Sequence, residues 1–325
     1  MVRAVIGGSG PASLGFGAAP LGNLFRPISD DDARAAVDAA WSAGVRYFDT
    51  APFYGLGLSE SRLGAALADR PRDSFVLSTK VGRRLLEDSR PSVDGLIDGQ
   101  WALPSGRNWV RDYSRDGVLK TLEESLQRLG CDRIDVVYLH DPDEHLDQVE
   151  REAAPMLAEL RDQGVISAFG VGTSDWRTAA RLVGSTDIDG VMIAGRWTLL
   201  DRSAAPLLDC AREAGVWVVA AGPFNSGLLS RPWPEDGARF EYSPAGTALV
   251  GLARDLASAC RRHGVELPDA AIQFATRTEG IVAVVAGIAS AAEAVADEAA
   301  FRREIPSGLW DELDRIVRDR RGEGG

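Results

Sequence analysis

Short apolar runs rich in β-branched residues alternate along this chain with segments of helical periodicity, and this alternation constrains the fold more than any other feature. The runs that we expect to form strands lie at 14–18, 46–50, 75–80, 134–140, 168–172, 190–194, 216–221 and 281–286. Helices are expected at 30–43, 59–68, 116–129, 148–163, 175–183, 204–214, 245–263 and 290–301, with an extra one at 307–320. Eight strands alternating with eight helices predict an α/β fold, a (β/α)8 TIM barrel with parallel strands and an extra C-terminal helix.

Length and composition fit one large barrel domain over residues 1–325. The chain is 45% hydrophobic and 26% charged, and its 36 Lys and Arg face 48 Asp and Glu, a net charge of -12. Such a surface repels nucleic acid and anionic lipid. No stretch approaches the ~20 apolar residues of a membrane span, and the N-terminus lacks the apolar core of a signal peptide. We expect a cytoplasmic protein, a monomer or small homo-oligomer, with a small neutral or cationic substrate.

Cysteine and histidine usage does not predict a metal site. The three cysteines are odd in number and have no CxxC spacing, so neither a zinc site nor a disulfide framework is expected. His140 and His145 lie close to Asp141 and Asp143, but the turn at Pro142 separates them. Because nothing else in the chain supplies matching ligands, we predict that the protein holds no metal.

Local signals mark several helix ends. Ser29 with Asp32 forms a sequence similar to a capping box, and Ser59 is expected to cap the helix at 59–68. Glycines follow four helices at the stop position: Gly44, Gly130, Gly164 and Gly215.

The connection after the third strand, residues 83–116, is unusually long for a compact domain. It carries Trp101 and Trp109, whose large apolar surfaces argue against disorder. We expect a lid over the barrel mouth that walls a substrate pocket; the alternative is a loop packed on the side of the barrel.

Four polar residues, Asp49, Tyr54, Lys80 and His140, form the most informative set in the chain. Three of them end predicted strands, where a βα-barrel places its chemistry, and Tyr54 follows on the first of those loops. An ammonium near Tyr54 favours its phenolate, Asp49 can orient that ammonium, and an imidazole can hydrogen-bond the reacting oxygen. Each residue alone has an ordinary structural explanation. Their joint occurrence favours proton transfer.

The chain resembles the aldo-keto reductases over nearly its whole length. The matching motifs are FDTAPFYGLGLSESRLGAAL at 48–67, STKVGR at 78–83, DYSRDGVLKTLEESLQRLGCDRIDVVYLHDPD at 112–143, FGVGTSDW at 169–176 and AAGPFNSGLLS at 220–230. GFGAAPLGNLF, DYS, AGRWTLLD and GPFNSGLL further resemble the branch that holds the L-fucose, D-threo-aldose and L-galactose 1-dehydrogenases and pyridoxal 4-dehydrogenase. The resemblance implies Tyr54 as general acid/base and a substrate pocket lined by Phe53, Trp109 and His140.

No GxGxxG follows the first strand, so a Rossmann site is not supported. The resemblance instead implies a nicotinamide cofactor extended across the barrel mouth. The family's Ser-Asn pair becomes Thr173 and Ser174, its Gln falls at Ala194, and its stacking aromatic falls at Ala221. The candidate cofactor residues are Thr173, Ser174, Gly222, Pro223, Phe224, Asn225, Ser226, Gly227, Gly287, Glu293 and Asp297.

The segment that begins at Gly287 predicts which cofactor is used. It has no cation before Arg302 and carries Glu293 and Asp297 instead. A carboxylate can bond the free ribose hydroxyl of NAD and would repel the 2'-phosphate of NADP. NAD is therefore the expected cofactor, with NADP as the alternative.

Together with these residues, the resemblance implies oxidation of an aldose at C1 to its lactone, with hydride transfer to NAD. The alternatives within enzymes are a pyridoxal 4-dehydrogenase and a general aldehyde or ketone reductase. A non-catalytic nucleotide-sensing subunit, like those of some potassium channels, is a third reading. The intact set of four polar residues and the lack of a basic or amphipathic N-terminal extension argue against it.

Overall fold

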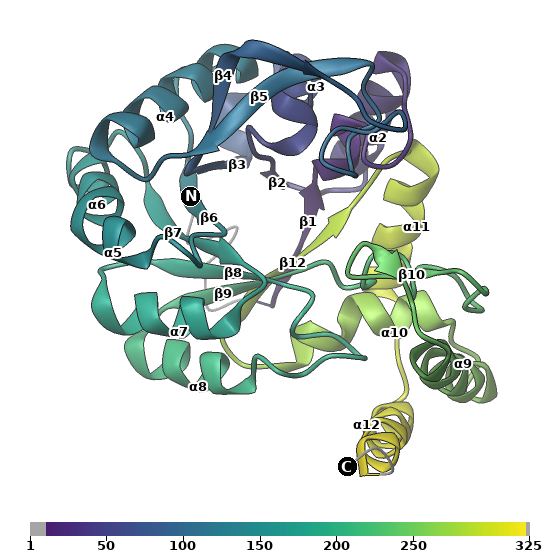
Figure 1. The fold of residues 1–325 in the computed structure, drawn as a ribbon. Helices are drawn as coiled ribbons and strands as arrows, with labels where there is room; N and C mark the ends of the chain where they lie inside the picture. Colours follow the sequence, from purple (N-terminus) through teal and green to yellow (C-terminus); the bar gives the residue numbers. More distant parts are fainter. Residues whose placement is uncertain (1–10, 323–325) are drawn as a thin grey trace.

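A computed structural model describes residues 11–322. Eight parallel strands close into a barrel in the order β1-β12-β9-β8-β7-β6-β3-β2 (Figure 1). They are β1 (Ser13–Gly17), β2 (Tyr47–Asp49), β3 (Val76–Val81), β6 (Val136–His140), β7 (Ala168–Thr173), β8 (Gly190–Ala194), β9 (Trp217–Ala221) and β12 (Ile281–Gly287). The predicted TIM barrel is confirmed.

Helices surround the barrel. They are α2 (Asp30–Ser42), α3 (Leu58–Leu67), α4 (Arg115–Leu129), α5 (Leu146–Gln148), α6 (Ala154–Asp162), α7 (Trp176–Ser185), α8 (Ala205–Ala214), α9 (Thr247–Arg262), α10 (Leu267–Gln273), α11 (Ala291–Arg302) and α12 (Ser307–Gly322). The helix expected at 148–163 is divided by a π-helical turn, η4 (Val149–Ala153). The extra C-terminal helix, α12, is present and packs on α9.

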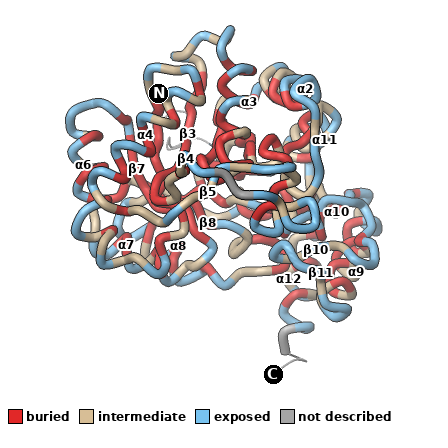
Figure 2. The backbone as a smooth tube through the Cα atoms, turned by 45° about the horizontal axis from the view of Figure 1, so that its top comes forward, coloured by how far each residue is buried: buried red, intermediate tan, exposed pale blue. Residues whose placement is uncertain are grey.

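Buried residues gather along the barrel strands and on the helices around them (Figure 2). The interior is small and contains the buried residues Tyr47, Val76, Val136, Tyr138, Ala168, Met192, Val219, Ala283 and Val285. A larger layer lies between the sheet and the helices, with Phe16, Phe48 and Phe169 fully buried. Strands covered on both faces explain the continuous apolar runs of the sequence.

The predicted Ser29 cap is confirmed, whereas the Ser59 cap is wrong. Ser29 Oγ accepts a hydrogen bond from Asp32 N at 3.0 Å. Ser59 lies inside α3 and is fully buried, and its Oγ donates to Ala18 O at 2.7 Å. A tertiary partner at the end of β1 therefore takes the hydroxyl that the local pattern assigned to the helix terminus. The four predicted stop glycines all have positive φ: Gly44, Gly130, Gly164 and Gly215.

Residues 83–116 form an antiparallel ribbon of β4 (Arg83–Pro91) and β5 (Ser105–Arg111) (Figure 1). The segment between its strands is anchored by Trp101, which is 1% exposed and packs with Phe53 at the end of the barrel where the strands terminate. We call that end the mouth. The ribbon therefore lies at the mouth rather than on the side of the barrel.

A second ribbon, β10 (Arg239–Phe240) and β11 (Ser243–Pro244), follows β9 and was not predicted. Short 3-10 turns also flank the mouth: η1 (Ala19–Gly22) after β1 and η2 (Tyr54–Gly57) after β2. The remaining ones are η3 (Arg72–Ser74) and η5 (Phe274–Arg277). Across residues 11–322, no helix has both the length and the apolar character that crossing a bilayer requires.

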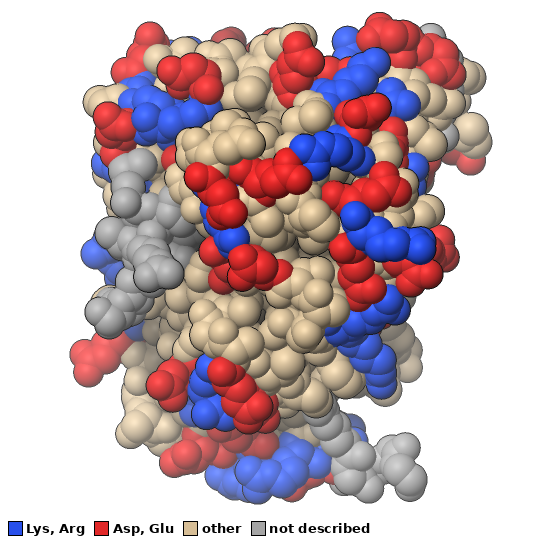
Figure 3. Space-filling model, turned by 90° about the vertical axis from the view of Figure 1, so that its left-hand side faces the viewer, with Lys and Arg blue, Asp and Glu red and all other residues tan. Residues whose placement is uncertain are grey.

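Charges of both signs are interleaved on the face drawn in Figure 3. Many are paired, for example Arg115 with Glu159 and Arg181 with Glu150. On this face acidic side chains lie beside the basic ones (Figure 3). Such a mixed surface does not attract a phosphate backbone as a continuous basic surface would.

Candidate active site

The ends of β2, β3 and β6 bring Asp49, Lys80 and His140 together at the mouth, since parallel strands present their carboxyl ends on one side. Asp49 is 3% exposed, Lys80 2% and His140 6%. Burial of three ionisable side chains at one place is costly unless they are paired. Their contacts show how this cost is met.

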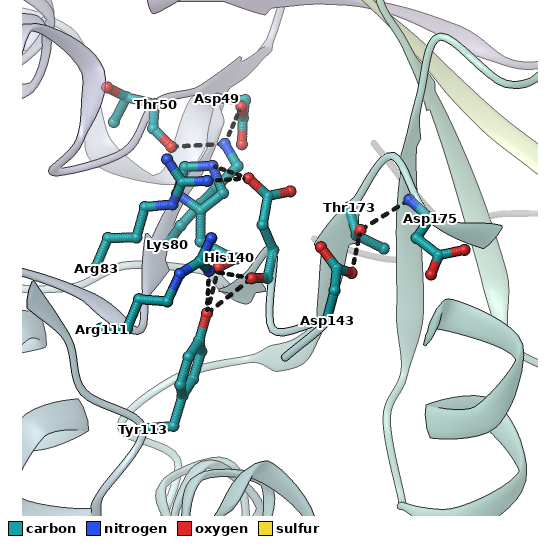
Figure 4. Close-up of polar contacts among 11 residues, drawn as sticks. Asp49, Thr50, Lys80, Arg83, Arg111, Tyr113, His140, Asp143, Thr173 and Asp175 are labelled. Atoms are coloured by element: carbon teal, nitrogen blue, oxygen red, sulfur yellow. Dashed lines mark hydrogen bonds and ion pairs between the residues drawn. The ribbon is translucent and has the colours of Figure 1, made fainter. Parts of the chain in front are cut away.

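Two oxygen acceptors hold the Lys80 ammonium (Figure 4). Its Nζ donates to Asp49 Oδ2 at 2.6 Å and to Thr50 O at 2.9 Å. Ser78 Oγ donates to Asp49 Oδ1 at 2.7 Å, which satisfies the second carboxylate oxygen. Burial alone would lower the pKa of Lys80, but Asp49 and Tyr54 together raise it above its usual value. Lys80 is therefore a fixed buried ammonium.

Tyr54 lies above this ammonium. Its ring centroid is 4.7 Å from Lys80 Nζ. A close backbone contact fixes the position of this turn, because a Cβ on Gly22 would lie 2.6 Å from Gly55 N. Burial raises the pKa of Tyr54 to about 12, while Lys80 lowers it and Asp49 raises it. The lowering by Lys80 that we expected is present, but burial outweighs it, so Tyr54 is a neutral phenol at neutral pH.

His140 faces Tyr54 edge to face, with ring centroids 5.7 Å apart and an interplanar angle of 89°. Burial, then the charges of Arg83 and Lys80, hold the pKa of His140 well below its usual value. The imidazole is therefore neutral, with one N–H donor. Its Nε2 lies 3.7 Å from Asp141 Oδ2, and its Nδ1 is buried without a partner among residues 11–322. The carboxylate favours the tautomer protonated on Nε2.

Aromatic side chains wall the space beside Tyr54 and His140. Phe53 lies 5.1 Å from Trp109, 5.4 Å from Trp101 and 6.2 Å from His140, measured between ring centroids. The structure thus brings together the three residues that the sequence assigned to the substrate pocket, Phe53, Trp109 and His140. Trp101 was predicted only as part of the lid, and it also lies 5.9 Å from Tyr54.

Tyr242, on the β10–β11 ribbon, borders the mouth from the other side and was missed by the sequence. Burial, then the charge of Asp141, raises the pKa of Tyr242 above its usual value, while Lys80 lowers it. Its ring is 6.0 Å from that of Phe25, and its backbone N donates to Ser226 Oγ at 3.1 Å. No local pattern links Tyr242 to the mouth, because its position depends on how the loop after β9 folds back.

The half of the mouth opposite the four polar residues is open. There β8, β9 and β12 end in Ala194, Ala221 and Gly287. A Cβ on Gly195 would meet nothing nearer than 3.8 Å, and one on Gly222 nothing nearer than 3.7 Å. Small residues at these successive strand ends leave space that larger side chains would fill.

The turn at 222–227 carries part of the predicted cofactor site. Asn225 and Ser226 have φ of 46° and 59°, and Gly227 has φ of 99°. Asn225 Nδ2 donates to Gly195 O at 3.2 Å, while its Oδ1 is buried and has no partner among the described residues. An orphaned acceptor beside an open groove suits a ligand with hydroxyl or amide donors. The site therefore fits a nicotinamide nucleotide.

Several other predicted cofactor residues are occupied by protein contacts. Thr173 Oγ1 donates to Asp143 Oδ1 and accepts from Asp175 N, both at 2.9 Å (Figure 4). Ser174 is exposed, and its carbonyl accepts from Arg196. Pro223 is buried and Phe224 partly buried against the core. These residues shape the groove through their backbone more than through free side chains.

The end of the groove beyond Gly287 holds an unexpected cation. Glu293 Oε2 accepts from Ala289 N at 2.7 Å, and Glu293 Oε1 lies 3.6 Å from Arg26 Nη2. Burial, then Glu293, raises the pKa of Asp297 to about 7, which weakens it as a negative group. The sequence segment has no cation before Arg302, but the fold supplies Arg26 from the chain after β1.

Within the part of the chain that the structure describes, no group of three or more His, Cys, Asp or Glu side chains is arranged to hold a metal ion. Cys131, Cys210 and Cys260 are free thiols.

The sequence profile of the Aldo/keto reductase family matches residues 13–318. D-threo-aldose 1-dehydrogenase of Pseudomonas sp is 44% identical over 304 residues, covering 93% of this chain and 92% of that protein. Pyridoxal 4-dehydrogenase of Microbacterium luteolum is 35% identical over 320 residues, with coverage of 93% and 92%.

Solved structures agree with the fold. An aldo-keto reductase of Bacillus halodurans in its holo form superimposes with a TM-score of 0.72 at 26% identity, covering 95% of this chain and 92% of that one. A glycerol dehydrogenase of Gluconobacter oxydans gives a TM-score of 0.75 at 20% identity, with coverage of 98% and 97%, and shows the shared fold alone.

Proposed function

The chain belongs to the aldo/keto reductase family, and from this premise we propose that it oxidises an aldose sugar at C1 to the lactone, with hydride transfer to NAD. The 44% identity to a D-threo-aldose 1-dehydrogenase supports the substrate class. The match over residues 13–318 supports a single barrel domain. We further propose that the protein acts in the cytoplasm on small molecules.

One observation carries the proposed chemistry: Tyr54 lies between a buried ammonium, Lys80, and a neutral imidazole, His140. A bound nicotinamide, held beside the turn at 222–227, would supply the acceptor for the hydride that leaves the carbinol carbon. Tyr54, as phenolate, accepts the hydroxyl proton, and Lys80 stabilises that phenolate. His140 donates from Nε2 to the substrate oxygen and orients it. In the reverse direction Tyr54 acts as the acid.

A second candidate is the oxidation of pyridoxal. The 35% identity to a pyridoxal 4-dehydrogenase favours it, and the aromatic wall of Phe53, Trp101 and Trp109 could stack on a pyridine ring. A screen for NAD reduction with aldoses, pyridoxal and simple alcohols separates the two. Our proposal expects the highest catalytic efficiency with an aldose, and a higher efficiency with pyridoxal would replace it.

Trp109→Ala should raise the KM for the sugar about tenfold and leave the dissociation constant of NAD nearly unchanged. The Trp109 ring lies against Phe53 in the wall of the proposed pocket. One lost aromatic contact with the sugar is worth on the order of 1 kcal/mol, close to the ~1.4 kcal/mol of a tenfold change. Trp233→Ala, at a Trp that is 39% exposed and stacks on arginines of α9, is the matched control. Equal losses of sugar and NAD binding would mean that the ribbon only supports the barrel.

Cofactor preference can be tested at Glu293. We expect the wild type to use NAD at least ~10-fold more efficiently than NADP, because the Glu293 charge would repel a phosphate and also engages Arg26. Glu293→Gln keeps an acceptor for Ala289 N, removes the charge and releases Arg26. Efficiency with NADP should then rise about tenfold, the scale of one charge-assisted hydrogen bond.

The double variant Glu293→Gln/Arg26→Met is the control for this test. It should lose the gain in efficiency with NADP that Glu293→Gln shows. A wild type that prefers NADP would contradict the proposed cofactor. Ala294→Arg would be a poor test of cofactor preference, because Ala294 is 1% exposed and packs in the core.

A further inference from the structure

A cluster of charges at the base of the β4–β5 ribbon is not used by the proton-transfer mechanism. Arg83 and Arg111 are cross-strand partners at the point where the ribbon joins the barrel. Two like charges in such a pair repel each other. Both converge on Asp141, the residue after His140, and Figure 4 shows Arg83 and Arg111 beside His140.

Asp141 is held by its backbone as well as by its side chain. Its φ is 44°, a left-handed conformation that non-glycine residues rarely adopt. Arg111 donates to Asp141 O, and Tyr113 Oη donates to the same oxygen at 3.1 Å and to His140 O at 2.6 Å. These bonds fix the chain that leaves β6 and so aim the Asp141 side chain towards the mouth.

The Asp141 carboxylate binds Arg83 through Oδ2 and lies 3.7 Å from His140 Nε2. Its side chain keeps 28% exposure. Arg83 stacks over Phe53 at 4.2 Å and Trp109 at 5.3 Å, and its Nε is buried without a partner in the same range. The partly exposed Asp141 carboxylate, with the Arg83 guanidinium bound to it, therefore lies beside the nitrogen that holds the reacting oxygen.

We propose that Arg83 and Asp141 determine specificity by binding the hydroxyl group on the carbon next to the reacting one. This inference rests on the proposed oxidoreductase chemistry at Tyr54. A hydroxyl donates one hydrogen bond and can accept another. A carboxylate can accept from it and a neighbouring guanidinium can donate to it. A site built to hydrogen-bond a substrate hydroxyl strongly rejects the analogue that lacks it. The pair would thus favour polyhydroxylated substrates over simple alcohols and aldehydes.

The test compares reduction of D-glyceraldehyde and propanal, which share three carbons and differ in their hydroxyl groups. The wild type should reduce glyceraldehyde at least ~10-fold more efficiently. Asp141→Asn keeps the shape but removes the charge of the carboxylate, and Arg83→Lys keeps the charge but removes the planar guanidinium, so each weakens one half of the hydrogen-bonding pair. Each should lower kcat/KM for glyceraldehyde about tenfold, mainly through KM, and change the value for propanal less than about threefold.

Arg84→Met is the matched control. Arg84 is the next residue on β4 and pairs with Asp112 at 3.1 Å with similar exposure, but it is not in contact with His140 or Asp141 in the structure. Arg84→Met should leave kcat/KM unchanged for both aldehydes. If the Asp141 and Arg83 variants lost kcat/KM equally for both aldehydes, the pair would only anchor the ribbon. That result would overturn the proposal.

A wild type that reduces propanal as well as glyceraldehyde would also overturn the proposal, while leaving the chemistry at Tyr54 intact. Failure of the aldose assignment would appear elsewhere, as the absence of NAD reduction with sugars. The two aldehydes can still be compared in that case, so the two failures are distinguishable.

Discussion

Tyr54→Phe should lower kcat by at least ~100-fold while the fold and the affinity for NAD persist. The phenol ring fills the same space against Trp101 and His140, so packing is preserved and only the proton-transferring oxygen is lost. General acid/base catalysis by a positioned side chain contributes about 100-fold to 10,000-fold. Steady-state kinetics with the sugar, together with NAD binding and the melting temperature, measure the three quantities separately.

Tyr242→Phe is the matched control for this substitution. It removes a second phenolic oxygen at the border of the mouth, and its backbone contact with Ser226 does not depend on the side chain. Its activity should stay within about threefold of the wild type. A Tyr54→Phe variant with more than a tenth of wild-type activity would show that Tyr54 is not the general acid/base.

Lys80→Met should have two large effects, on stability and on the pH profile. It leaves the buried Asp49 carboxylate without its cation, and breaking a buried pair from one side costs about 3 to 5 kcal/mol in free energy of unfolding. It also removes the charge that lowers the pKa of Tyr54. Denaturant unfolding and the pH dependence of kcat/KM measure these effects.

The direction of the pH effect follows from the state of Tyr54. Oxidation requires the phenolate, whose population rises with pH towards the Tyr54 pKa of about 12, so the wild-type rate should rise from neutral into alkaline pH. Without Lys80 the pKa is higher, and the rising limb should move to higher pH. An unshifted profile would show that Lys80 does not tune Tyr54.

A double variant, Lys80→Met/Asp49→Leu, separates the two effects. Replacing both members of a buried ion pair with apolar residues is often neutral for stability. The double variant should therefore recover much of the free energy of unfolding but none of the activity. Recovery of activity would contradict the role of Lys80.

The barrel could be predicted because its signal is local and repeated. Each strand is an apolar run between helical segments, and parallel strands place their ends together whatever the detailed packing. Asp49, Lys80 and His140 each end such a strand, so their proximity followed from the strand count. The seven-residue helix α10 was not predicted, because it is too short to show helical periodicity.

Other features depended on tertiary contacts that no local pattern contains. Ser59 looked like a helix cap and instead bonds across to Ala18 O. Tyr242 and Arg26 reach the mouth on loops that fold back from distant parts of the sequence. The sequence predicts that Lys80 lowers the pKa of Tyr54, because both residues are visible in it. It does not show how deeply Tyr54 is buried, and burial raises that pKa more than Lys80 lowers it.

The most direct measurement of the proposed function uses an aldose deuterated at C1 together with NAD. We expect equimolar lactone and reduced cofactor, with the deuterium recovered on the nicotinamide ring and a slower rate than with the unlabelled sugar. Reduced cofactor without deuterium, or no reduction of NAD by any aldose, would contradict hydride transfer from C1.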